Sequence, residues 1–156
     1  MSGSDDYVYG GARALVSLHA IHLQDFMHAW REAQNAAVVL PTSDSKNYRS
    51  LEALLRHTLK AARDYLVWLC KNLELGDPAV DSAPEIDDVV AAADDYVAHL
   101  IDRFSSPLRQ VAAERFSNRI FSFYRSEMTA ESLLEHAVMH PIRHAYQLRR
   151  LVAEQT

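Results

Sequence analysis

The chain has 156 residues, of which 49% are hydrophobic and 24% charged, and this composition is typical of one globular domain spanning residues 1–156. Its net charge of −5 argues against binding to nucleic acid or to an anionic membrane, because phosphate binding requires a basic surface. No apolar run approaches the roughly 20 residues of a membrane span. The polar N-terminus lacks a signal-peptide core, and Cys70 is the sole cysteine, so we expect a cytoplasmic protein without an internal disulfide.

Apolar residues at three- and four-residue spacing predict two long helices in the first half of the chain. The first is expected over residues 11–36, before the break at residues 41–45, and the second over residues 48–75, ended by Gly76 and Pro78. The expected inward positions are Leu15, Leu18, His22, Phe26, Ala29 and Ala33 in the first helix, and Leu51, Leu54, Leu55, Ala62, Tyr65, Leu69 and Leu73 in the second.

The second half of the chain predicts two further long helices. Residues 82–85 (Ser-Ala-Pro-Glu) match a capping box with proline in the first turn, so a third helix is expected to begin there and to end before Pro107. Thr129 is a good N-cap for a last helix that runs to the C-terminus. The inward positions of the third helix are Ile86, Val89, Val90, Ala93, Val97, Leu100, Ile101 and Phe104.

Between these helices, residues 108–116 are compatible with a short helix and residues 119–124 with an extended segment. Elsewhere there is no strong strand pattern. Four long amphipathic helices in this order predict an all-α fold, specifically an antiparallel four-helix bundle.

Two histidines lie on the apolar stripe of the last helix, which also contains Leu133, Ala137, Leu148 and Leu151. His140 and His144 are four residues apart, so their Cβ atoms lie about 5–6 Å apart on one face and both imidazoles can reach one metal ion. His57 lies at the edge of the apolar arc of the second helix, with the small side chains of Ala53 and Ala61 one turn to either side. Three imidazoles from two helices predict an open metal site. The alternative is a hydrogen-bonded core pair, with His57 at the solvent boundary.

Three neighbouring residues bear on this site. His136, one turn before His140, is a candidate fourth ligand, a group that supports the ligands, or a surface residue, and we favour the last two. Gln147 either orients a ligand or substrate through its amide or is an ordinary polar residue. Pro141 removes the hydrogen bond to the Ala137 carbonyl, at a cost of about 3 kcal/mol in an ordinary helix. A kink or bulge is therefore expected between the two histidines.

The first helix carries a second, weaker group of histidines. His22 is expected on the core stripe, with His19 three residues before it and His28 further along. Such a pair can bind a metal, but no carboxylate or third histidine joins it. We expect core or boundary histidines whose ring nitrogens have hydrogen-bond partners.

Two segments resemble the DinB-like (damage-inducible) superfamily of four-helix-bundle metalloproteins. They are residues 54–57 (LLRH) and residues 133–148 (LLEHAVMHPIRHAYQL). The family motif combines a lone histidine on the second helix with H-x-x-x-H followed by x-x-Q-L. The resemblance implies His57, His140 and His144 as metal ligands, with Gln147 at the position of the trailing glutamine.

The resemblance also implies a divalent metal ion, commonly nickel or zinc, with coordination positions left for water. Characterised relatives include thiol-dependent S-transferases and a mycothiol-dependent isomerase, so a low-molecular-weight thiol is an implied cofactor and a homodimer an implied assembly. Tyr146, where the family often has glycine, and Pro141, between the two ligands, depart from its commonest pattern.

These observations favour a metal-dependent enzyme, a transferase or hydrolase with a small-molecule substrate. Three neutral imidazoles leave the charge of the ion uncompensated, which lowers the pKa of a bound water or thiol. No residue stands out as a general base, and Asp64 is expected in a surface ion pair. The alternatives are a non-enzymatic, stress-related metal-binding protein and a metal-free helical interaction protein. Cys70 is expected on the outward side of its helix, away from the fourth position of a structural zinc site.

Overall fold

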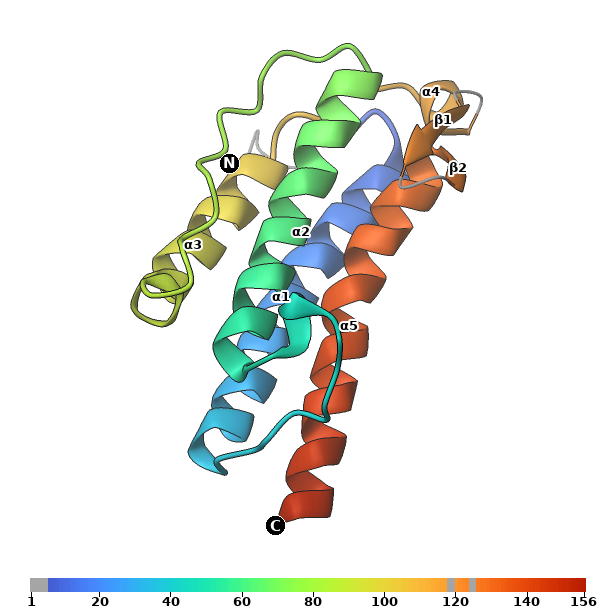
Figure 1. The fold of residues 1–156 in the computed structure, drawn as a ribbon. Helices are drawn as coiled ribbons and strands as arrows, with labels where there is room; N and C mark the ends of the chain where they lie inside the picture. Colours follow the sequence, from blue (N-terminus) through green and yellow to red (C-terminus); the bar gives the residue numbers. More distant parts are fainter. Residues whose placement is uncertain (1–5, 118–119, 124–125) are drawn as a thin grey trace.

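The computed structural model describes residues 6–117, 120–123 and 126–156, and this part of the chain is mostly helical (Figure 1). The long helices are α1 (Gly10–Asn35), α2 (Leu51–Asn72), α3 (Val89–Phe104) and α5 (Ala130–Gln155). The short elements are the 3₁₀-helix η1 (Lys46–Tyr48), α4 (Ala113–Ser117) and an antiparallel hairpin of β1 (Ile120–Phe123) and β2 (Ser126–Thr129). The all-α prediction is confirmed, with this small hairpin added.

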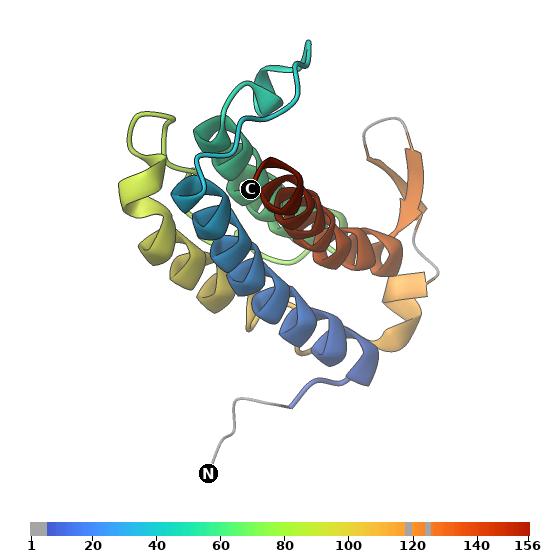
Figure 2. The same ribbon diagram turned by 90° about the horizontal axis from the view of Figure 1, so that it is seen from below.

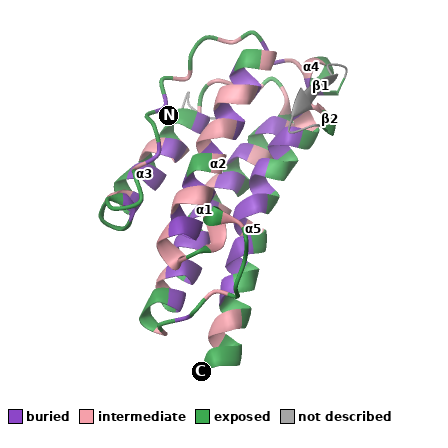
Figure 3. Ribbon diagram, viewed as in Figure 1, coloured by how far each residue is buried: buried purple, intermediate pink, exposed green. Residues whose placement is uncertain are grey.

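The long helices lie side by side along most of their length (Figures 1 and 2). α5 packs along α1 and also against α2, while α3 covers α2 and α1 from the other side. The buried residues lie mainly on the sides of the helices that face one another (Figure 3), and the largest fully buried side chains include those of Trp30, Phe26, Phe104 and Phe116. None of the helices in the described part of the chain is both long enough and apolar enough to cross a membrane.

The inward face of α1 differs from the predicted one. Leu18 is 41% exposed, and His22 is half-buried, whereas His19 and Leu23 are fully buried. The reason is that α1 packs against α5, α3 and α2, so its buried arc is wide and its centre is set by these partners. Periodicity placed the stripe one residue off in the first half of the helix, whereas Phe26, Ala29 and Ala33 are buried as predicted.

The start of α3 also differs from prediction. The helix begins at Val89, and its N-cap residue Asp88 makes no side-chain capping hydrogen bond. Ile86 is 47% exposed and Val90 is 37% exposed, so neither is a core position. Residues 82–85 therefore do not form the expected capping box.

Tertiary hydrogen bonds explain why this segment is not helical. Arg56 on α2 donates from Nε to the carbonyl of Pro84 (3.1 Å), and Tyr96 donates from its hydroxyl to the carbonyl of Asp81 (2.8 Å). His99 accepts a hydrogen bond from the backbone N–H of Asp81 through Nε2 (2.9 Å). Side chains from α2 and α3 thus bind the backbone of this segment, and Arg56 occupies the Pro84 carbonyl, which a helix beginning at Ser82 would have used.

The region before α5 agrees with prediction in part. The helix expected over residues 108–116 is limited to α4, and the extended segment expected over residues 119–124 is confirmed as β1, with Arg119 and Tyr124 outside the described residues. Thr129 caps α5 as predicted, because its side chain accepts a hydrogen bond from the backbone N–H of Ser132 (3.0 Å).

Candidate metal centre

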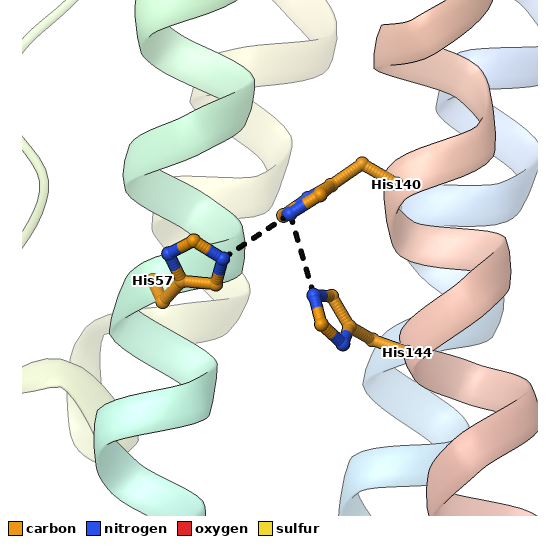
Figure 4. A group of neighbouring side chains, drawn as sticks. All are labelled: His57, His140 and His144. Carbon is orange, nitrogen blue, oxygen red and sulfur yellow. Dashed lines mark hydrogen bonds between the residues drawn. The ribbon is translucent and has the colours of Figure 1, made fainter. Parts of the chain in front are cut away.

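The three histidines singled out by the sequence meet between α2 and α5. His57 projects from α2, and His140 and His144 project from successive turns of α5, with the three rings pointing toward one another (Figure 4). Nε2 of His140 lies 3.2 Å from Nε2 of His57 and 3.3 Å from Nε2 of His144. One ligand atom from each residue lies within 4.8 Å of the others. Their predicted proximity is confirmed.

These nitrogen–nitrogen distances suit a shared metal ion. Imidazole nitrogens bound at about 2.0–2.1 Å in tetrahedral geometry lie about 3.3 Å from one another. Without an ion, Nε2 of His140 carries either one proton or one lone pair, so it cannot form a full hydrogen bond with both neighbours. An ion accepts all three lone pairs at once. The donor set therefore fits a divalent metal better than it fits a hydrogen-bonded core.

Gln147 fixes the tautomer of one of these rings. Its Oε1 lies 3.0 Å from Nδ1 of His144. An amide oxygen accepts hydrogen bonds only, so His144 donates from Nδ1 and its lone pair is on Nε2, the atom that faces His140. This contact is the kind that orients metal-bound histidines in proteins.

Burial keeps the cluster neutral. Desolvation lowers the pKa of His140 to about 2 and that of His144 to about 4, and the neighbouring histidines and the Arg143 guanidinium add to the effect. The pKa of His57 is lowered as well, chiefly by burial. At neutral pH the three imidazoles therefore offer lone pairs, which is the state that binds metals.

Pro141 does not separate the two histidines of α5. The helix is continuous from Ala130 to Gln155 with Pro141 inside it, and the ring centroids of His140 and His144 are 4.6 Å apart. The helix therefore continues despite the loss of one hydrogen bond at Pro141. The spacing of four residues still places His140 and His144 on the same face of α5.

The rings of Tyr48 and Tyr65 pack against the histidine cluster. The ring of Tyr48, from η1, lies 5.8 Å from that of His57 and 6.0 Å from that of His144. The ring of Tyr65, from α2, lies 5.9 Å from that of His140. Tyr48 was not predicted as a site residue: it was expected at the start of the second helix, whereas the structure places it in η1, ahead of Leu51, where only tertiary packing brings it to the histidines.

His136 lies outside the converging group. Its side chain is exposed, its ring contacts Tyr65 edge-on at 5.5 Å, and its centroid is 6.5 Å from that of His140. Asp64 is in an ion pair, as expected, with its carboxylate 2.6 Å from Nζ of Lys60. Within the described residues, no other histidine, cysteine or carboxylate joins the three ligand atoms.

The prediction that Cys70 faces outward is wrong. Cys70 is buried, at 1% exposure, because it belongs to a core cluster that also contains Leu66 and Leu69 and lies close to the segment of residues 75–81 that leads to α3. Desolvation raises the pKa of its thiol to about 11, with Asp77 contributing. It is not part of the histidine group.

The weaker histidine group on α1 does not form a site. His19 is fully buried against Phe104, with ring centroids 4.2 Å apart, and neither ring nitrogen has a hydrogen-bond partner among the described residues. Burial lowers its pKa to about 4. His22 is half-buried and His28 is exposed. The expectation that a core histidine here has hydrogen-bond partners is therefore wrong.

Two hollows are each lined by a member of the three-histidine cluster. One, of about 630 Å³, is lined by His144, Gln147 and Tyr48 among others. The other, of about 380 Å³, is lined by His57 and Tyr65 together with the basic side chains Lys46, Arg56 and Lys60 and the acidic Asp64. The cluster is thus accessible to small molecules while most of its ring surface is buried.

Comparison of the chain with models of protein families, with curated proteins and with solved structures gave no match, so the interpretation of this centre depends on its own geometry and chemistry.

Proposed function

We propose that the protein is a metal-dependent enzyme of the DinB-like four-helix-bundle type, with His57, His140 and His144 as the ligands of a nickel or zinc ion. The observation that carries the proposal is the convergence of three neutral imidazoles, with Nε2 atoms 3.2 and 3.3 Å apart around His140. Gln147 supports it by fixing the tautomer of His144.

An open site favours catalysis over a purely structural role. Structural zinc sites usually have four protein ligands, often including cysteine, whereas the described residues supply three and Cys70 lies elsewhere. The two hollows beside the cluster leave room for an external ligand. When bound, such an ion lowers the pKa of a water or thiol and supplies a nucleophile near neutral pH. The reaction class we propose is therefore thiol-dependent S-transfer or hydrolysis of a small molecule.

The first test is the metal content of tag-free protein, measured by inductively coupled plasma mass spectrometry. We expect about one metal ion per chain in the wild type and in the matched control His28→Ala, whose side chain is exposed on α1. His57→Ala and His140→Ala should both lose it. If the wild type contains no metal and takes up neither nickel nor zinc, the proposal is wrong.

Activity is tested on the loaded protein. Consumption of glutathione in the presence of an electrophile, and hydrolysis of an activated ester, should both be followed for the wild type and for His140→Ala. A rate that depends on the metal and disappears in the variant would assign the reaction class. Equal rates in both proteins would contradict a role for the ion in catalysis.

A further inference from the structure

The larger hollow is a well-formed pocket beside the histidine cluster. Its volume is about 630 Å³, within the roughly 300–1,000 Å³ of typical small-molecule sites. The linker between α1 and α2 crosses in front of α5 here (Figure 1), and Leu40 to Ser43 of this linker contribute to the lining. His144 and Gln147 lie in its wall, so an occupant would lie next to the proposed ion.

One part of the pocket wall is apolar. Four leucines line it, of which Leu54 and Leu148 are buried and Leu40 and Leu151 are half-buried. The ring of Tyr48 completes this wall next to the cluster. Binding of an apolar body of suitable length to such a surface is favourable, because it removes apolar area from water.

The pocket lining also carries a net positive charge. It contains the guanidinium groups of Arg143 and Arg150 and the carboxylate of Glu154, so its net charge is +1. Arg150 is engaged with Glu154, at 2.7 Å. Arg143 has no acidic partner among the described residues and lies next to His144 in the chain. A divalent ion on the histidines would make this end of the pocket still more positive.

We infer that this pocket binds the substrate of the metal centre, and that the substrate is a small carboxylic acid with an apolar body. Its carboxylate is held by Arg143, and its body lies along Leu40, Leu54, Leu148 and Leu151. A guanidinium suits this task because it donates two parallel hydrogen bonds to a carboxylate. That the bound molecule is a substrate rests on the proposed function, whereas its binding in the pocket does not.

Octanoate and its neutral counterpart 1-octanol are suitable probes, because they share the apolar chain and differ in charge. Isothermal titration calorimetry should be carried out on the metal-free and the zinc-loaded wild type, on Arg143→Gln, and on the control Arg103→Gln, which alters an exposed arginine on α3. We expect octanoate to bind more tightly than octanol. Arg143→Gln should weaken octanoate about tenfold, the loss of a charge-assisted hydrogen bond, and leave octanol unchanged. Arg103→Gln should behave as the wild type.

Leu151→Asp provides a second test of location, since it places a carboxylate in the apolar wall and should weaken both probes. The inference is overturned if octanoate does not bind, if it binds no more tightly than octanol, or if Arg143→Gln binds it as the wild type does.

The metal content of the same samples separates the two proposals. Octanoate bound by a protein that takes up no metal would support the pocket and refute the metal enzyme. Metal uptake without octanoate binding would refute the pocket alone.

Discussion

The molecule buries histidines in two contrasting surroundings. Between α2 and α5, three rings bring their nitrogens together, and Gln147 accepts a hydrogen bond from one of them. Between α1 and α3, His19 is alone against Phe104, and both its nitrogens lack hydrogen-bond partners among the described residues. Both environments lower histidine pKa values, chiefly by desolvation.

The difference shows that burial of an imidazole does not by itself indicate a site. At His19 the cost of desolvation has no visible compensation, and such an unsatisfied polar group costs about 1–3 kcal/mol. In the cluster an ion bound as we propose would offset the same cost by accepting the three lone pairs. The two regions differ because ring nitrogens of three histidines converge between α2 and α5, whereas His19 has no such neighbour among the described residues. The following experiments test that difference.

The largest expected effect is on the acid stability of the metal-free protein. The pKa of His19 is lowered to about 4 in the folded protein and returns to its ordinary value near 6.5 on unfolding. The unfolded state therefore binds the extra proton first, and the free energy of unfolding decreases as the pH falls from about 6.5 to about 4, with His19 alone contributing about 3 kcal/mol. His19→Leu should remove this part of the loss, as measured by urea denaturation at pH 7.5 and pH 4.

Gln24, an exposed residue on α1 without a titratable group, provides the control for that experiment. Gln24→Leu should leave the pH dependence of the wild type unchanged. Parallel curves for the wild type and His19→Leu would mean that His19 has a proton acceptor or a solvent path that the structure does not show.

Zinc should stabilise the folded protein through the three-histidine cluster, and His19 should not contribute to this effect. At a free zinc concentration about 100 times the dissociation constant, the folded wild type should gain about 2.7 kcal/mol. The gain should persist in His19→Leu and vanish in His140→Ala, because the latter removes the central ligand. Denaturant titrations with zinc and with a chelator measure it. An equal zinc effect in His140→Ala would place the ion elsewhere.

The contact between Gln147 and His144 should matter for affinity. Gln147→Leu removes the acceptor of the Nδ1–H group, and loss of such an orienting partner typically lowers metal affinity about 10–100-fold. Gln147→Glu keeps an acceptor and should retain the affinity. Competition with a chromophoric chelator measures both, with Gln24→Leu, an exposed position on α1, as the control. Unchanged affinity in Gln147→Leu would show that the contact does not orient the ring.

The smallest expected effect concerns His136. Because its side chain is exposed and its ring centroid lies 6.5 Å from that of His140, His136→Ala should change neither metal stoichiometry nor affinity in the same competition titration. A loss as large as that expected for Gln147→Leu would make His136 part of the centre and would weaken the case for an open site.

Much of the fold and of the candidate site could be predicted from the sequence. The strong periodicity of α2 and α5 predicted most of their inward positions, with Cys70 of α2 an exception, and the side chain of Thr129 marked the start of α5, because local geometry dictates both features. The four-residue spacing of His140 and His144 placed both on one face, since an α-helix has 3.6 residues per turn.

Other features depended on partners distant in the chain. Arg56 and Tyr96 hold the segment before α3 away from a helical conformation, and the packing of α1 against three helices decided that His19 rather than His22 is buried. The sequence by itself thus determined the helices and the histidine pair of α5, through short-range periodicity. Only the tertiary structure decided that His57 meets this pair, that Tyr48 lies against it, and that beside it opens a pocket whose Arg143 has no acidic partner among the described residues. Contacts between separate helices follow from packing and not from spacing.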